Sequence, residues 1–198
     1  MPIRNRREEN SRRGIKPFMS EETAAVIKAV EESTKDALLA SSIEISPTAL
    51  TLVKTVLFKN GTVITDTEVT AEAVKKLNAG GSFEVRCFID NDDVIKLAEA
   101  HRATRAEIAL DMGLALPGPK LVLIGSAPAA LNRLLGHRRH EPLSEVCVLA
   151  TVAGYAAANQ LKEKLRESDT AYIITRGKSG GPAAAVNIVA AVMTSKHN

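Results

Sequence analysis

The stretch that decides the fold is YIITRGKSGGPAAAVNIV, which occupies residues 172–189. It opens with apolar and β-branched residues up to Thr175, a pattern typical of a buried strand, and it closes with an alanine-rich helix pattern. Between them lie a glycine-rich turn and Pro182, a residue that suits the first turn of a helix. Free N–H groups and the positive end of a helix dipole meet at such a turn, so the stretch predicts a strand–helix unit with a seat for an anion.

The centre of the stretch, Gly177-Lys178-Ser179, has the form of the end of a nucleotide phosphate loop. That motif also requires a glycine five positions before Gly177, so that backbone N–H groups can wrap the phosphate. Position 172 is tyrosine. We therefore expect the turn to receive a different anion, or else to serve only as a tight turn.

Strand patterns also precede this stretch, and helix patterns separate them. The strand patterns are Thr62–Thr65, Phe83–Ile89, Lys120–Ile124, Glu145–Leu149 and Ala171–Thr175. The helix patterns are Glu21–Ala40, Pro47–Lys59, Thr67–Leu77, Asp92–Met112, Ala127–Leu135, Val152–Arg166 and Pro182–Thr194. Ser46 is the expected N-cap of the second helix, with Pro47 as its first residue.

Such alternation predicts an α/β fold built on a parallel sheet. We expect a flavodoxin-like, doubly wound, five-stranded parallel sheet with helices on both faces, preceded by two extra N-terminal helices. Residues 17–198 would form this single domain, and residues 1–16 a flexible basic tail.

The amino-acid composition limits which cellular compartment and which binding partners we expect for this protein. The chain has 198 residues, of which 45% are hydrophobic and 25% charged, as expected for one ordinary domain. No apolar run approaches the roughly 20 residues that span a membrane, and no apolar segment follows the N-terminal arginines. Cys87 and Cys147 lie in apolar strand patterns, so we expect buried thiols and a cytoplasmic protein. The cysteines and histidines lack zinc-site spacing, so we expect no metal.

The positive charge is concentrated in the tail. Residues 1–16 hold six basic and two acidic side chains, a net charge of +4, whereas the whole chain carries +3. The remainder is therefore slightly acidic, and we expect no nucleic-acid partner. The tail is either solvated or closes over an anionic ligand.

Ligands of doubly wound sheets bind beyond the carboxyl ends of the strands. Gly125-Ser126 and the loop from Arg176 to Gly181 lie there, each before a helix with proline in its first turn. Arg105 follows Thr104 within a predicted helix. It is either an ordinary surface charge or a guanidinium partner for a carboxylate.

Several segments, in this order, resemble the precorrin-8X methylmutase family, also called the cobalt-precorrin-8 methylmutase family. The matching sequence motifs are DTEV at 66–69, CFID at 87–90, TRAEIAL at 104–110, LVLIGSAPAALNRLL at 121–135, VAGYAAANQLKEKL at 152–165 and YIITRGKSGGPAAAVNIV at 172–189. The resemblance covers roughly residues 20–194.

The resemblance implies a flavodoxin-like homodimer that uses no cofactor and shifts a methyl group between adjacent carbons of ring C of a contracted tetrapyrrole, late in cobalamin biosynthesis. The substrate is a polycarboxylate, so helix starts and arginine would receive carboxylates. The implied substrate contacts are Thr34, Thr67, Thr104, Arg105, Gly125, Ser126, Arg176, Gly177, Gly180 and Gly181.

The chain departs from the family pattern at the position of its proton-donating histidine, which here is Glu32. The chain's histidines all lie elsewhere, at positions 101, 137, 140 and 197. Gln160-Leu161 also replaces a Glu-Ser pair of the family, whereas Lys162 is retained. A buried Glu32 with a raised pKa would be able to donate a proton, whereas an exposed, ionised one would not.

Three functions therefore stay open from the sequence. The first is an isomerase of this family, with Glu32 as the catalytic residue. The second is a non-catalytic paralogue that binds a corrinoid or another polycarboxylate tetrapyrrole. The third is a flavodoxin-like flavin or nucleotide binder, which the low aromatic content of 3% disfavours.

Overall fold

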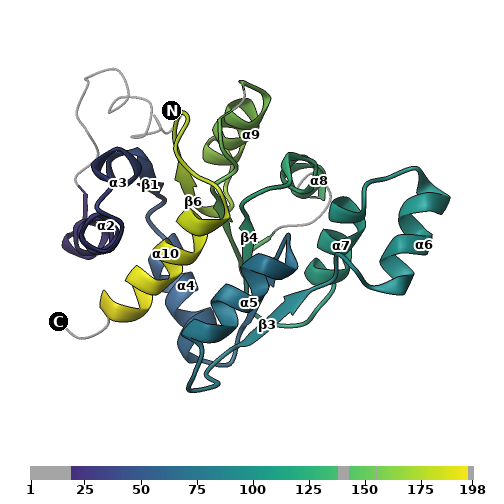
Figure 1. Cartoon of the computed structure of the whole chain (residues 1–198), viewed down its shortest axis with the longest axis horizontal. Coiled ribbons are helices and arrows are strands. Elements are labelled where there is room, and N and C mark those ends of the chain that lie inside the picture. Colours follow the sequence, from purple (N-terminus) through teal and green to yellow (C-terminus); the bar gives the residue numbers. More distant parts are fainter. Residues whose placement is uncertain (1–18, 138–142, 155, 196–198) are drawn as a thin grey trace, which may run out of the picture.

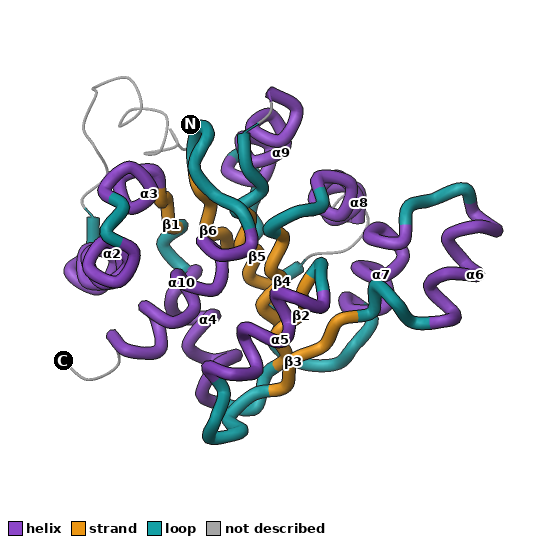
Figure 2. The backbone as a smooth tube through the Cα atoms, in the orientation of Figure 1, coloured by secondary structure: helices purple, strands orange, loops and turns teal. Residues whose placement is uncertain are grey.

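The structure, a computed structural model, describes residues 19–137, 143–154 and 156–195. The predicted tail and two of the histidines, His140 and His197, lie outside them. Six strands form one sheet in the order β1-β6-β5-β4-β2-β3 (Figures 1 and 2). Their bounds are β1 Ile43–Ile45, β2 Thr62–Thr65, β3 Glu84–Cys87, β4 Lys120–Ile124, β5 Val146–Ala150 and β6 Ala171–Thr175.

The strands β2 to β6 are mutually parallel. Among themselves they have the order 2-1-3-4-5, which is that of flavodoxin-like doubly wound sheets. The prediction of five strands was wrong by one, because β1 adds an antiparallel edge strand beside β6. Three residues are too few to predict a strand alone, and β1 is stabilised by the open edge of β6.

Helices cover both faces of the sheet. One face carries α2 (Glu21–Thr34), α3 (Ala37–Ser42), α4 (Ala49–Phe58), α5 (Glu68–Leu77) and α10 (Pro182–Thr194). The other face carries α7 (Arg105–Leu114), α8 (Pro128–His137) and α9 (Ala156–Arg166), and α6 (Asp92–His101) packs on α7 at the outer edge (Figure 1).

Successive residues of the central strands point to opposite faces, and both faces are buried. In β4, Leu121 and Leu123 pack beneath α4 and α10, whereas Val122 and Ile124 pack beneath α7 and α8. Every residue of β4, β5 and β6 is buried. This is why these strands read as continuous apolar runs rather than as alternating ones.

Two predicted long helices are broken in the structure. The segment from Glu21 to Ala40 divides at Lys35, which has a φ of 57°, and Asp36 then caps α3. The segment from Asp92 to Met112 divides at Arg102, which has a φ of 53°. Side-chain caps compete locally with continued helix, and they decide both boundaries.

Ser46 is not the N-cap of α4, whose first residue is Ala49 and whose N-cap is Thr48. Instead, the Tyr172 N–H donates to Ser46 Oγ at 2.8 Å, and the Ser46 N–H donates to the Tyr172 carbonyl oxygen at 2.9 Å. Ser46 therefore continues the pairing of β1 with β6. None of the described helices is both long enough and apolar enough to cross a membrane.

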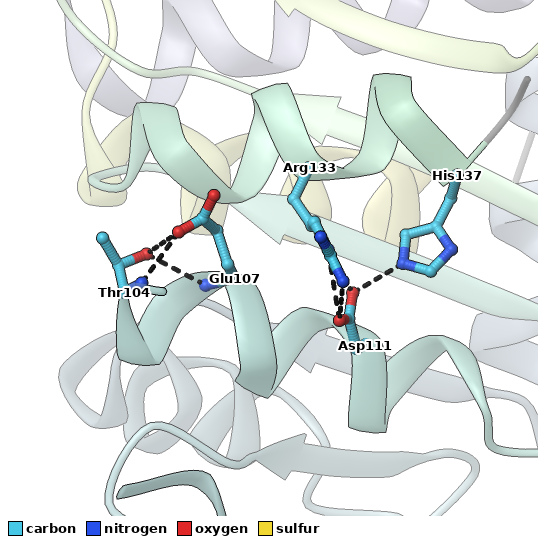
Figure 3. Close-up of polar contacts among 5 residues, drawn as sticks. All are labelled: Thr104, Glu107, Asp111, Arg133 and His137. Atoms are coloured by element: carbon cyan, nitrogen blue, oxygen red, sulfur yellow. Dashed lines mark hydrogen bonds and ion pairs between the residues drawn. The ribbon is translucent and has the colours of Figure 1, made fainter. Parts of the chain in front are cut away.

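An ion-paired cluster joins α7 to α8 (Figure 3). The Arg133 guanidinium donates to both carboxylate oxygens of Asp111, and His137 Nε2 lies 2.6 Å from Asp111 Oδ1. Partial burial tends to raise the pKa of Asp111, but the hydrogen bonds and charges of Arg133 and His137 outweigh it and lower the pKa. His137, predicted to lie in a surface loop, is the last residue of α8.

Replacing Asp111 with asparagine is expected to lower the free energy of unfolding at pH 7 by about 1–2 kcal/mol, because hydrogen bonds to a charged group are lost. A lowered folded-state pKa gives stability that is present above the ordinary carboxyl pKa and is lost as pH falls through the folded-state value. The difference between wild type and variant should therefore shrink in acid. Urea denaturation at pH 7 and at about pH 3 checks this, with the exposed Glu167→Gln as control. A difference independent of pH would contradict it.

Candidate functional site

The carboxyl ends of the five parallel strands form one rim of the sheet. The residues just beyond them are Asp66 after β2, Asp90 near the end of β3, Gly125 after β4, Thr151 after β5 and Arg176 after β6. In doubly wound sheets this rim is where ligands bind.

The N–H groups just before α8 already bind a carboxyl group of the chain itself. The Ser126 and Ala127 N–H groups donate to Asp66 Oδ2 at 2.6 and 2.9 Å. Asp66 is only 8% exposed, and this burial raises its pKa, while the backbone hydrogen bonds act in the opposite direction. The N–H groups of Ser126 and Ala127 are therefore already bonded to Asp66.

The two glycine turns of the rim pack against each other. A Cβ on Gly125 would lie 2.8 Å from Pro182 Cα, so the absence of a side chain lets α8 and α10 begin side by side. Thr151 lies between them, because its Oγ1 donates to the Gly181 carbonyl oxygen at 2.8 Å. The structure therefore brings Gly125, Gly180 and Gly181 together.

Arg176 is held at the edge of the rim by acidic side chains. Its Nε lies 3.1 Å from Glu44 Oε2 on β1, and its NH2 lies 3.8 Å from Glu163 Oε1 on α9. Its backbone N–H donates to the Ser42 carbonyl oxygen at 2.8 Å. Gly177 follows it with a φ of 67°, a backbone conformation that favours glycine. The guanidinium is about half exposed and is still accessible to a ligand.

Thr104 and Arg105 begin α7 rather than lying inside a helix. Thr104 is the N-cap and forms a capping box with Glu107 (Figure 3). Arg105 NH1 donates to Asp90 Oδ1 at 3.0 Å, and both side chains are more than half exposed. Exposed pairs of this kind are weak, so a ligand carboxylate can compete for Arg105.

Two other predicted contacts cap helix ends. Thr34 Oγ1 donates to the Val30 carbonyl oxygen at 2.7 Å and accepts from the Asp36 N–H, at the end of α2. Thr67 is the N-cap of α5 and accepts from the Thr70 N–H. Both hydroxyls therefore have local partners.

Glu32 lies on α2, and its side chain is 65% exposed. Its carboxylate is 3.7 Å from Lys28 Nζ, one helical turn earlier. The chain that follows passes through α3 and reaches the carboxyl end of β6, where Ile43 pairs with Thr175. Glu32 is thus near the β1 edge of the sheet, and its side chain is exposed within the part of the chain that the structure describes.

The predicted contacts are spread along the whole rim. Arg105 lies next to β3, and Arg176 lies next to β6. These two strands are four strand spacings apart in the sheet, a distance of roughly 19 Å. Arg105 lines a cavity of about 480 Å³ against α6, whereas Arg176 and Gly177 line one of about 200 Å³ beside α9. The structure joins the glycine turns and keeps the two arginines apart.

Sequence reasoning assigned no role to two polar residues beneath the rim, Asp66 and Lys162. Asp66 directly follows a buried strand, which is a signal for a strand-end carboxylate. Lys162 is spaced with Ala158 and Leu165 on the buried side of α9, so its position on an apolar stripe is a signal as well. In the described part of the chain, no group of three or more His, Cys, Asp or Glu side chains is placed to hold a metal ion.

Fold and rim together define a class: a doubly wound α/β protein with glycine turns at the carboxyl ends of its parallel strands. A family model described as precorrin-8X methylmutase matches residues 3–195. The chain therefore belongs to the precorrin-8X methylmutase family.

Individual relatives agree with this assignment. The chain is 30% identical over 178 residues to the cobalt-precorrin-8 methylmutase of Salmonella typhimurium. This alignment covers 89% of this chain and 83% of that protein. It is 29% identical over 162 residues to the cobalt-precorrin-8 methylmutase of Methanothermobacter thermautotrophicus. This alignment covers 82% of this chain and 75% of that protein.

Solved structures share the fold. A precorrin-8X methylmutase from Thermus thermophilus superposes with a TM-score of 0.75 at 21% identity, covering 95% of this chain and 92% of that one. A precorrin-8X methylmutase related protein superposes with a TM-score of 0.79 at 21% identity, covering 89% of this chain and 93% of that one.

Proposed function

We propose that this chain is an isomerase that converts precorrin-8X, or its cobalt form, by moving a methyl group on ring C of the tetrapyrrole during cobalamin biosynthesis. The single observation that carries the proposal is the family match, which runs from residue 3 to residue 195 and so includes α2 and every loop of the rim. The relatives described above are methylmutases.

The rim supports a large anionic substrate. Arg105 and Arg176 are both about half exposed and lie toward opposite edges of the sheet. Roughly 19 Å between their strands suits a flat macrocycle whose acidic side chains reach both. Thr34, Thr67, Thr104 and the turns at Gly125-Ser126 and Gly177–Gly181 would complete the contacts along this edge.

Glu32 is the proposed acid of the reaction. Protonating or hydrogen-bonding the macrocycle changes its electron distribution and eases the methyl shift. Because Glu32 is exposed among the described residues, we propose that the bound macrocycle or a second subunit buries it. We accordingly propose a cytoplasmic homodimer without a cofactor, in which substrate and partner cover α2.

The test is to mix the purified protein with precorrin-8X and to follow the absorption spectrum. A spectrum that proceeds to that of the methyl-shifted product supports the isomerase. A single shift on binding, with the methyl group still in its original position by NMR, would favour the non-catalytic alternative. No spectral change at stoichiometric protein would contradict both.

A further inference from the structure

The topological switch point of the sheet lies between β2 and β4. The chain passes from β2 outward to β3, then returns to β4 and continues to β5 and β6 on the other side. The helices that follow β2 and β4, α5 and α8, accordingly lie on opposite faces of the sheet. Ligands of doubly wound sheets bind at such a point, and here Asp66 and Ser126 stand on its two sides.

The backbone just before α8 has the form of an anion seat, and Asp66 occupies it. The Ser126 and Ala127 N–H groups donate to Asp66 Oδ2 at 2.6 and 2.9 Å. Ser126 is exposed and Ala127 is half-buried, so the turn that carries these N–H groups lies at the surface of the rim. The ten residues of α8 add the positive end of a helix dipole. With a shorter residue at position 66, these donors would be available to an anionic group of a ligand.

Capping alone does not explain why a carboxyl group stands at position 66. Ser20 and Thr104 cap their helices with an exposed hydroxyl group. Asp66, in contrast, is 8% exposed, and its second oxygen, Oδ1, is buried without a hydrogen-bond partner among the described residues. Burying a carboxyl group with one oxygen unpaired costs free energy. What this carboxyl group supplies beyond a hydroxyl is negative charge at the switch point.

We propose that Asp66 is a specificity-determining residue of the methyl shift, because it fills the anion seat before α8 with the chain's own carboxyl group. The acidic side chains of the tetrapyrrole are thereby left to Arg105 and Arg176 at the two edges of the rim. Gly125 and Ser126 then contact an uncharged part of the macrocycle, and ligands that carry phosphate are rejected at the switch point. The inference rests on the proposed function, since it orients the substrate of that function.

A polycarboxylate needs such a residue because the rim offers it several anion-binding groups. Specificity depends on groups that reject a wrong arrangement as much as on those that attract the right one. A carboxylate directed at the middle of the rim meets the negative charge of Asp66 and finds the Ser126 and Ala127 N–H groups already bonded. An orientation that places the acidic groups at both edges meets neither obstacle.

The first experiment measures the seat without turnover, with inorganic phosphate as the probe. Its ³¹P resonance is followed at constant ionic strength in wild type and in Asp66→Ala. The variant should bind phosphate about 10-fold or more tightly than wild type does, because two N–H donors and a helix dipole become available. Its Tm should be lower than that of wild type, and phosphate should recover part of the loss. A merely structural cap would lose stability without gaining phosphate.

Two control variants separate the opened seat from other causes. Asp66→Asn keeps a carbonyl oxygen that accepts from both N–H groups, so it should not gain phosphate binding. Asp36→Ala removes another aspartate that caps a helix, the exposed Asp36 of α3, and should not gain it either. Should Asp66→Ala not fold, Asp66→Ser, whose side chain is shorter but still polar, takes its place.

The second experiment connects the seat to the substrate. Precorrin-8X is titrated into wild type and Asp66→Ala, with and without phosphate. Phosphate at ten times its own dissociation constant should weaken the macrocycle's apparent affinity for the variant by about 10-fold and should change that of wild type little. Without phosphate, the variant should bind precorrin-8X at least as tightly as wild type does but shift the methyl group about 10-fold or more slowly, because a carboxylate in the opened seat turns the macrocycle.

The outcomes separate the role of Asp66 from the function. If wild type turns over precorrin-8X and Asp66→Ala gains no phosphate binding, the role of Asp66 is wrong and the isomerase stands. If wild type gives no turnover but Asp66→Ala gains phosphate that competes with precorrin-8X, the role stands and the isomerase is wrong. Equal gains in Asp66→Asn or Asp36→Ala, or a gain in Asp66→Ala without competition, overturn the role of Asp66 in selecting the substrate's orientation.

Discussion

Replacing Glu32 with glutamine is expected to slow the methyl shift by about 100-fold or more, because an amide cannot donate a proton to the macrocycle and general acid catalysis contributes at least that much. Binding of precorrin-8X should change little, since the two side chains have the same shape. Single-turnover absorbance with precorrin-8X measures the rate, and titration under the same conditions measures affinity.

Because Glu32 lies on the surface, Glu32→Gln is expected to change the reaction without changing the stability of the fold. Its exposed pair with Lys28 contributes little to stability, so the Tm should stay at that of wild type. Glu31→Gln alters the neighbouring exposed carboxylate of α2 and should leave the rate unchanged. Glu32→His restores a proton donor that titrates near neutral pH, and it should match or exceed the wild-type rate. Full activity in Glu32→Gln would show that this carboxyl is not the acid.

Replacing Gly180 with alanine is expected to lower the free energy of unfolding by about 3 kcal/mol or more. Gly180 has a φ of 145°, a region that residues with a Cβ rarely adopt and that costs about 1–3 kcal/mol. A Cβ there would also lie 2.1 Å from the Thr151 carbonyl oxygen and 2.9 Å from Thr175 Oγ1, so the backbone of the loop must move. Urea denaturation followed by circular dichroism measures the loss.

Gly177→Ala is the matched control in the same loop. Gly177 also has a positive φ of 67°, but a Cβ there would meet no atom within 4 Å. Only backbone strain of about 1 kcal/mol is then expected. Equal losses in the two variants would show that close packing against Thr151 and Thr175 does not decide the stability of this loop.

The sequence by itself determined the strand–helix alternation and the position of the glycine turns at the carboxyl ends of the strands. Strands β2, β4 and β6 lie where their apolar runs predict, and α10 begins and ends at the predicted residues. These features depend on side-chain periodicity and on glycine and proline, which act over a few neighbouring residues. The family resemblance rests on short sequence motifs in a fixed order near those strand ends, and the family match confirmed it.

Only the tertiary structure decided which groups meet at that edge. Asp66 reaches the start of α8 across 60 residues of sequence, β1 pairs with the edge of β6, and Lys162 turns inward beneath the rim. No local pattern encodes these contacts, because each depends on how strands and helices distant in sequence are placed side by side. The same holds for the exposure of Glu32, which follows from how α2 packs on α10. Local periodicity therefore fixes the elements and their order, whereas the charges and hydrogen bonds of the site arise from packing.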